Sequence, residues 1–167
     1  MTLVNLFKIL ALIIWFIYLI FLFIFIPFLC KKLDNFLKFY LYFSTLGKIF
    51  GIFLIIVGLI LGIWCLTILW IKGKGTPSFL YPPQKLVKEG PYKYCRNPMT
   101  LGAWIIFLGE ALIFESLSLL LFLILIGIPM GTLWIFKYEE PFLEKKFKED
   151  YLNYKKTVPR WIPKFFK

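Results

Sequence analysis

Histidine is absent from this sequence of 167 residues, and cysteine occurs only three times. The lack of histidine excludes catalytic triads, proton shuttles and metal sites that depend on imidazole. Cys30, Cys65 and Cys95 are far apart and form no Cys-x-x-Cys pair, so neither a zinc site nor a disulfide framework is predicted. We expect no metal ion, and we expect Cys95 to serve in packing rather than as a nucleophile.

Acidic residues are also scarce, because nine Asp and Glu stand against twenty Lys and Arg, for a net charge of +11. A charge of this sign can indicate nucleic-acid binding, but the cations flank apolar runs and no nucleic-acid motif accompanies them. We therefore predict no nucleic-acid partner. Anionic lipid headgroups are the expected neighbours of these cations.

Apolar residues are abundant: 60% of the sequence is hydrophobic and 21% is aromatic, which exceeds the usage of ordinary soluble domains. Four apolar runs predict four transmembrane helices, at residues 3–29, 46–71, 98–114 and 117–136. Only Glu115 and Ser116 separate the last two runs, which predicts a tight hairpin. The predicted fold class is an all-α integral membrane protein in contact with the lipid bilayer.

Positive charge gathers on one side of these predicted spans. The loop after the second run and the segment after the fourth must share a side, and they hold most of the cations: Lys72, Lys74, Lys85, Lys88, Lys93 and Arg96, then Lys137, Lys145, Lys146, Lys148, Lys155, Lys156, Arg160, Lys164 and Lys167. The opposite loop holds Lys31, Lys32, Lys38 and Lys48. The positive-inside rule therefore predicts that the first side and both termini are cytoplasmic.

Glycines of the second run lie on one narrow stripe of the predicted helix, at Gly47, Gly51, Gly58 and Gly62. Two of the spacings are small-xxx-small patterns, which allow transmembrane helices to pack closely. We expect another helix against this stripe, although it could equally be a second copy of the chain; chance placement of glycines is the alternative. The oligomeric state is left open.

Pro129 lies between two glycines in the fourth run and predicts a kink there, because proline cannot donate to the carbonyl of Leu125. Such a kink is either purely structural or opens a pocket towards the cytoplasmic end.

The segment 141–158 is amphipathic, with apolar residues recurring every three or four positions among lysines and acids. This spacing predicts a helix that lies at the membrane surface with its lysines towards the headgroups. The tail that follows contains Trp161 and two prolines, Pro159 and Pro163, and is predicted to fold back as an ordered cap.

The polar loop 73–97 contains four prolines, which exclude a continuous helix. At its end, Asn97 and Pro98 are typical of an N-cap followed by proline at the first helical position. The third span would then begin with free amides and a positive dipole end, which can receive a carboxylate or phosphate. An ordinary helix start without a ligand is the alternative.

Glu139 and Glu140 follow the fourth span on the same predicted side. They are either a solvated helix end or the acidic counterpart of the amides and Arg96. A zwitterionic ligand with a carboxylate, an ammonium group and ribose hydroxyls, such as S-adenosylmethionine, would suit both groups. Glu110, deeper in the third span, is expected to reach the far interface and is left out of the site.

Two stretches, "LVKEGPYKYCRNPMTLG" and "EEPFLEKKFKEDYLNYKKTVPRWIP", together resemble the isoprenylcysteine carboxyl methyltransferase and phospholipid methyltransferase family. The resemblance covers residues 73 to 163 and rests on Leu-Val, Gly-x-Tyr, Arg-x-Pro, the Glu-Glu pair, Tyr-x-x-Tyr and Val-Pro in this order. It implies a small multi-span fold that binds S-adenosylmethionine at the cytoplasmic membrane face and methylates a lipid-borne or hydrophobic acceptor.

The resemblance also implies the cofactor-binding residues, which are Leu86, Val87, Tyr92, Asn97, Pro98, Met99, Thr100, Glu139 and Glu140. Two positions depart from the commonest pattern of the family. Asn97 replaces a histidine, as in the phospholipid branch, and keeps the ability to cap a helix. Thr100 replaces a tyrosine, which removes an aromatic wall from the implied cofactor site. No catalytic residue is assigned.

The predicted function is methyl transfer from S-adenosylmethionine to a prenylcysteine carboxylate or a phospholipid amine. A membrane reductase that uses NADPH and a scaffold or small transporter without catalytic activity are the alternatives; the sequence contains neither a dinucleotide fingerprint nor an inverted repeat. We expect one structural domain, in which residues 1–72 contribute two spans and residues 73–167 form the methyltransferase core.

Overall fold

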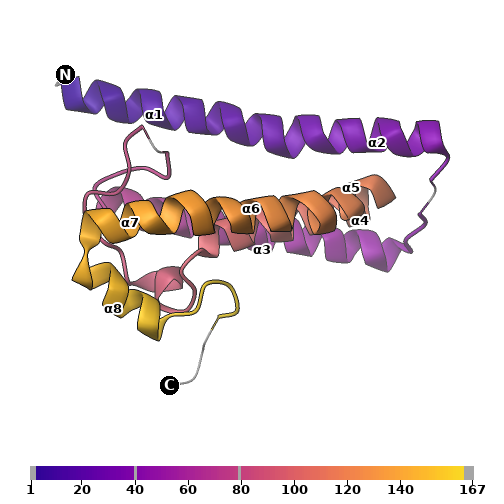
Figure 1. Ribbon diagram of the computed structural model, residues 1–167. Helices are drawn as coiled ribbons and strands as arrows, with labels where there is room; N and C mark the ends of the chain where they lie inside the picture. The colour runs from indigo at the N-terminus through magenta and orange to yellow at the C-terminus, as the bar shows by residue number, and fades with distance from the viewer. Residues whose placement is uncertain (1–2, 40, 79, 164–167) are drawn as a thin grey trace.

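All regular structure is helical in the residues that the computed structural model describes, which are 3–39, 41–78 and 80–163. The helices form long rods that lie side by side (Figure 1). The first rod is continuous from α1 (Leu3–Ile20) through the π-helical η1 (Phe21–Phe25) to α2 (Ile26–Leu37). The predicted all-α fold is confirmed.

The other rods are α3 (Thr45–Ile71), α4 (Pro98–Ile113) and a composite fourth rod. This last rod contains α5 (Leu117–Phe122), η3 (Leu123–Gly127), α6 (Ile128–Trp134), η4 (Ile135–Glu139) and α7 (Glu140–Phe147). A separate short helix, α8 (Glu149–Thr157), follows it, and the 3-10 turn η2 (Gly90–Lys93) lies in the loop between α3 and α4.

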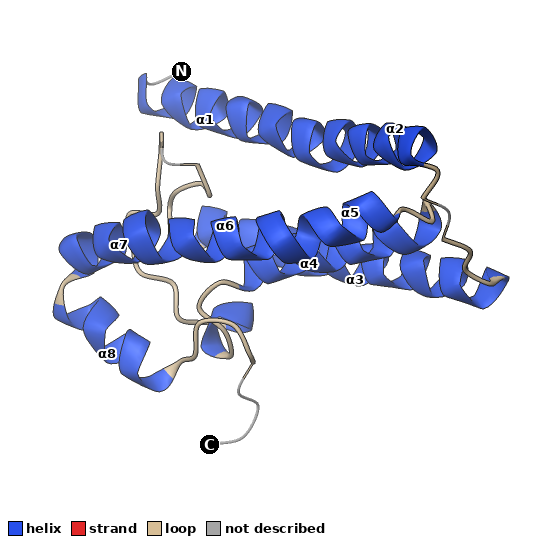
Figure 2. Ribbon diagram, turned by 45° about the vertical axis from the view of Figure 1, so that its right-hand side comes forward, coloured by secondary structure: helices blue, strands red, loops and turns tan. Residues whose placement is uncertain are grey.

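Three of the four rods are long and apolar enough to cross a membrane: Leu6–Leu37, Thr45–Ile71 and Leu117–Phe147. The helix α4 has 16 residues and is therefore about 24 Å long, which is less than the roughly 30 Å of a hydrocarbon core. It lies antiparallel to α3 and pairs with it along its length (Figure 2). The structure thus contains three helices of full spanning length and one shorter apolar helix, where the sequence predicts four spans.

Each π-helical segment of the described chain ends two residues before a proline: η1 before Pro27, η3 before Pro129 and η4 before Pro141. A proline ring clashes with the carbonyl four residues earlier and cannot donate a hydrogen bond to it. A wider turn before the proline relieves this clash while the helix continues. At Pro129, where the sequence predicts a kink, the rod continues through the π-helical η3 that precedes the proline (Figure 1). Pro129 itself is exposed.

The contact between α3 and α4 is a zipper of glycines. Gly51 meets the backbone oxygen of Gly109, and Gly58 meets that of Gly102, so that a Cβ at Gly58 would lie 2.6 Å from the Gly102 oxygen. The predicted close approach of a second helix is confirmed at these two positions, with α4 as the partner. The two outer glycines of the stripe do not contact α4. Gly47 lies against Phe43, four residues earlier in the chain, and Gly62 has open space around it.

A buried apolar cluster joins α2 to α4 and the start of the fourth rod, and it contains Cys30, Phe107, Ala111, Leu119 and Leu123. At the same end of the bundle, Asp34 is 1% exposed and accepts hydrogen bonds from the Ser116 hydroxyl and, at 2.9 Å, from the Ser118 amide. These bonds fasten the hairpin between α4 and α5 to the end of α2. We call this the hairpin end.

The opposite end of the bundle, which we call the loop end, contains the start of α1, the loop 73–97, α8 and the tail 158–163 (Figure 1). The expectation of one amphipathic surface helix over 141–158 is wrong, because α7 continues the fourth rod and the chain turns at Lys148 into α8. Lys148 has φ 48° and ψ −127°, a conformation that favours glycine. Tyr151 and Tyr154 are buried, so the apolar side of α8 faces the protein.

Candidate functional site

A buried carboxylate, Glu140, is the centre of a charged cluster at the loop end. Its oxygens accept hydrogen bonds from Arg160 Nε at 2.8 Å and Nη2 at 2.9 Å, and Lys155 Nζ lies 3.4 Å away. Arg96 Nη1 lies 2.8 Å from the same carboxylate. Because the Glu140 side chain is only 3% exposed, three cations hold it inside the protein, and the carboxylate in turn keeps Arg160 charged by raising its pKa.

Arg96 is nearly as buried, with 8% of its side chain exposed, but its donors are not all used. Neither Nε nor Nη1 forms a hydrogen bond of acceptable geometry with any described residue. Arg96 directly precedes the amino end of α4, where the backbone amides of Met99 and Thr100 have no partner in the described part of the chain. Buried donors without acceptors are costly, so this corner of the structure is suited to an anionic group.

The side chain of Asn97 does not cap α4, contrary to the expectation from sequence. Asn97 occupies the N-cap position and Pro98 the first turn, but the Asn97 amide nitrogen donates to the backbone oxygen of Arg160 at 3.2 Å. The Asn97 side chain is held by its hydrogen bond to the tail instead of capping the helix. The first amides of α4 are therefore left without the cap that Asn97 could provide.

The tail 158–163 is an ordered cap over the amino end of α4, as predicted. The Arg96 amide donates to the Pro159 oxygen at 2.9 Å, and the Cys95 thiol donates to the Arg160 oxygen at 3.2 Å. The indole of Trp161 packs on that of Trp104 in α4, with ring centroids 4.4 Å apart. Cys95, at 2% exposure, therefore serves in packing and in fixing the tail.

Tyrosines fill the space between the loop, α3 and α8. The Tyr154 hydroxyl donates to the Tyr92 backbone oxygen at 2.6 Å, and the Tyr92 side chain lies beside Cys65 of α3. Burial raises the pKa of Tyr92 and Tyr154 well above the usual range, and the nearby carboxylate of Glu139 contributes at Tyr92. These hydroxyls stay protonated at physiological pH and act as neutral hydrogen-bonding groups.

Glu139 differs from its neighbour Glu140. It is half-buried, and it makes no ion pair or hydrogen bond with the residues that the structure describes. Tyr92 and Tyr151 are close enough for its charge to raise their pKa values. Both acids thus lie at the loop end. Glu140 is bound by three cations, whereas Glu139 has no partner among the described residues.

The remaining predicted residues lie around the same corner. Val87 is buried at 7% exposure and packs on Gly73 at the end of α3, and Leu86 beside it is half-buried. Pro98 is buried, and Met99 and Thr100 are half-buried in the first turn of α4. The structure therefore brings the two sequence stretches together, because the 2.8 Å contact between Arg96 and Glu140 joins the start of α4 to the fourth rod.

Two important residues were not singled out from the sequence as site residues. Arg160 and Lys155 were counted only among the interfacial cations, yet both bind Glu140. No local pattern marks them, because Lys155 and Arg160 lie 15 and 20 residues after Glu140 in the sequence. The predicted fold-back of the tail brings Arg160 to Glu140.

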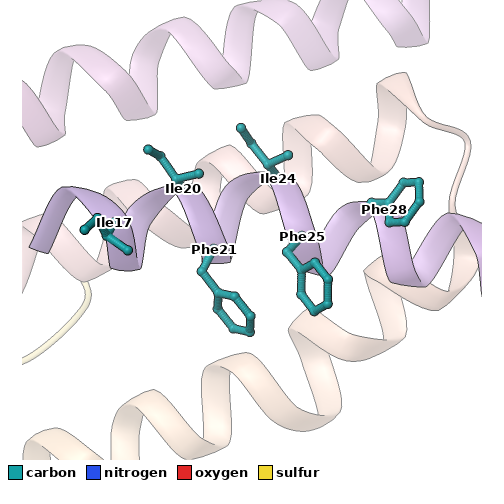
Figure 3. Close-up of a pocket in the computed structure, with 6 residues that line it drawn as sticks. All are labelled: Ile17, Ile20, Phe21, Ile24, Phe25 and Phe28. Carbon is teal, nitrogen blue, oxygen red and sulfur yellow. The ribbon is translucent and has the colours of Figure 1, made fainter. Parts of the chain in front are cut away.

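Two apolar hollows of the described chain lie away from this cluster. One is an apolar hollow on the first rod, lined by side chains from Ile17 to Phe28 that all come from one helix (Figure 3). Ile17, Ile20, Ile24 and three phenylalanines offer no polar atom to a charged ligand. We take this to be a lipid-facing surface rather than a cofactor site.

Glu110 is buried in α4 at 8% exposure, and its Oε2 has no hydrogen-bond partner among the described residues. The sequence-based expectation that Glu110 reaches the far interface is therefore wrong, because its side chain is buried inside the bundle. It lies twelve positions after Pro98, about 18 Å along the helix, and so it is not part of the cluster at the loop end.

In a comparison with protein families, residues 46–150 match the family described as phospholipid methyltransferase. The match runs from α3 into α8 and includes Arg96, the start of α4 and both acids of the fourth rod. No curated protein matches the chain. Since the match covers most of the sequence and confirms the resemblance given by the two motif stretches, the chain belongs to the phospholipid methyltransferase family, whose members are membrane methyltransferases.

Proposed function

We propose that this protein is an S-adenosylmethionine-dependent methyltransferase that acts on a membrane-embedded lipid acceptor at the cytoplasmic face of the membrane. The observation that carries the proposal is the pairing of unused groups at the loop end. Arg96 pairs with Glu140 through Nη1, but its Nε and the first amides of α4 are donors without acceptors among the described residues. The nearby Glu139 is an acceptor without donors in the same part of the chain.

These residues fit a zwitterionic amino-acid cofactor. The amides of Met99 and Thr100, with Arg96, suit its carboxylate, because a helix amino end and a buried guanidinium both favour an anion. Glu139 suits its ammonium group or its ribose hydroxyls. Glu140 does not contact the cofactor in this proposal; it holds Arg96 and Arg160 in place, which assigns different roles to the two acids of the pair.

When bound, S-adenosylmethionine supplies a methyl group on a positively charged sulfur. The protein's task is then to align donor and acceptor and to exclude water, and good alignment alone can contribute roughly 7 to 11 kcal/mol. The neutral hydroxyls of Tyr92 and Tyr154 close the site without adding charge. A carboxylate acceptor reacts in its ionised form, whereas an amine acceptor must first lose a proton, for which Glu139 is the base we propose.

The distribution of charge supports the cytoplasmic location. The loop 73–97, α8 and the tail share the loop end of the bundle, and that end carries most of the lysines and arginines. The acceptor is expected to be a prenylcysteine carboxylate or a phospholipid amine, with its apolar part between the rods.

Binding measurements on the full chain in mild detergent test this proposal. Calorimetric titration with S-adenosylmethionine or its demethylated product should show one binding site, and NADPH should show none. Binding of NADPH alone would indicate a reductase, and binding of neither ligand would favour a scaffold or transporter; either result overturns the proposal.

The acceptor is then identified with a radiolabelled methyl group and membranes that contain both candidate lipids. A labelled prenylcysteine ester releases its methyl group in mild base, whereas a labelled phospholipid amine keeps it. Label in neither lipid, from protein that binds the cofactor, would contradict the proposed acceptors.

A further inference from the structure

We propose that the loop end of α1 carries a binding site for an anionic phospholipid, with the lipid phosphate on Lys8 and one acyl chain in the groove between α1 and α3. This site is separate from the methyl-transfer site and does not depend on the proposed function. Its ligand is a bound lipid that is not methylated.

The cation of this site is unusual in its surroundings. Lys8 is half-buried, and its ammonium group lies 5.1 Å from the ring centroid of Tyr81 and 5.8 Å from that of Trp70. No described carboxylate forms an ion pair with it. Two acids of the loop end are paired with other lysines, Glu89 with Lys72 and Asp150 with Lys88. Lys8 therefore has aromatic neighbours and an uncompensated charge, which favours an anionic ligand.

An apolar groove of about 220 Å³ shares Trp70 with the surroundings of Lys8. Leu12 and Phe16, one and two turns after Lys8, form one wall, and α3 forms the other with Leu66, Thr67, Trp70 and Ile71. Thr67 directs its hydroxyl to the Ile63 oxygen at 2.8 Å, so it adds no free polar group to the wall. A hydrocarbon chain fits this lining, whereas a polar ligand does not.

The packing of the first rod leaves a groove that a lipid could fill. Its second half, α2, packs directly against α5, but α1 faces α3 across this groove. Phe16, Trp70 and Ile71 remain 43% to 65% exposed at its edges. An acyl chain in the groove would cover these side chains and fasten α1 to the rest of the bundle.

The phosphate source is a lipid headgroup because the cation and the groove are adjacent. A basic site between transmembrane helices beside aromatic residues, at the cytoplasmic side, is a typical place for an anionic lipid. The opposite side of α3 carries Cys65, which meets Tyr92, so the groove does not open onto the methyl-transfer site.

The test compares two lipids with identical acyl chains, phosphatidylglycerol and phosphatidylcholine, added to the delipidated full-length protein in mild detergent. Phosphatidylglycerol should raise the midpoint of thermal unfolding and appear as one retained adduct in native mass spectrometry. Phosphatidylcholine should do neither. Equal stabilisation by both lipids, or none by either, overturns the proposal without the need for any variant.

Variants then locate the site. Lys8→Gln should weaken phosphatidylglycerol binding about five-fold, the effect of one lysine at an anionic membrane surface, and Lys8→Arg should restore it. Lys32→Gln is the matched control, because Lys32 also lies over a ring, that of Phe28, at 4.8 Å, but at the hairpin end and away from the groove. An unchanged lipid response in Lys8→Gln, or an equal loss in Lys32→Gln, would place the lipid elsewhere.

Discussion

Each end of the bundle contains a buried carboxylate, and the two are held in opposite ways. At the hairpin end, Asp34 accepts bonds from a serine hydroxyl and a backbone amide and has no cation within ion-pair distance among the described residues. At the loop end, Glu140 is bound by two arginines and a lysine. The hairpin-end acid is a helix cap, whereas the loop-end acid organises charge.

The groups that surround the two acids also differ in how completely they are paired. The groups that contact Asp34 have partners within the protein, which is what a purely structural junction requires. Around Glu140, by contrast, Arg96 Nε has no acceptor and Glu139 has no partner among the residues that the structure describes. Incomplete pairing around Glu140 and complete pairing around Asp34 indicate which of these two junctions is suited to a ligand.

The largest effect is expected from removal of the Glu140 carboxylate. Glu140→Ala leaves Arg96 and Arg160 without their anion, and it should lower the free energy of unfolding by about 3 to 5 kcal/mol. Chemical unfolding in mild detergent measures this. Glu144→Ala is the control, since Glu144 pairs only with the partly exposed Lys155 and should cost less than about 1 kcal/mol. Equal effects of the two variants would show that the cluster around Glu140 is an ordinary surface network.

The glycine zipper that connects the two ends gives the next largest effect. Gly58→Ala would place a Cβ 2.6 Å from the Gly102 oxygen and force α3 and α4 apart, at a cost of about 1 to 3 kcal/mol. Gly62→Ala, on the same helix but in open space, should be neutral or slightly stabilising. If thermal unfolding ranks the two variants in the reverse order, the described contact between α3 and α4 is wrong.

A change at the hairpin end should affect stability alone. Asp34→Asn keeps the shape of the side chain but turns an amide group towards donors, which should cost about 1 to 3 kcal/mol. The affinity for S-adenosylmethionine should remain that of the unaltered protein. A loss of cofactor affinity equal to that of a loop-end variant would remove the distinction between the two ends.

The smallest effect is expected at the turn between α7 and α8. Lys148→Gly relieves a backbone conformation that side chains disfavour, and it should stabilise the protein by about 1 kcal/mol. The control is Lys145→Gly in the helical α7, which should destabilise by about the same amount. A destabilised Lys148→Gly variant would mean that the turn does not have this conformation.

Much of this architecture could be predicted from the sequence, because the apolar runs and the glycine spacing are local signals. The bounds of α3 and the close approach at Gly51 and Gly58 followed directly from them. The roles of Glu139 and Glu140 could not be separated in this way. Their difference depends on Arg160, which reaches Glu140 only because the tail folds back, and no local pattern encodes that contact.

The same long-range contact explains the misassigned cap. Asn97 before Pro98 is typical of an N-cap, but the competing acceptor is the backbone oxygen of Arg160, which lies far along the chain. The π-helical segments before the prolines were also missed. Hydrophobic spacing does not distinguish a kinked helix from one that widens a turn and continues.

The most direct test of the account compares Glu139→Gln with Glu144→Gln by calorimetric titration with S-adenosylmethionine, together with thermal unfolding of both variants. Glu139→Gln should bind the cofactor about ten-fold more weakly or worse, the loss expected for one charge-assisted contact, and should unfold at the same temperature as the unaltered protein. Glu144→Gln should bind normally. Unchanged affinity in Glu139→Gln would contradict the claim that the unpartnered acid at the loop end faces the ligand.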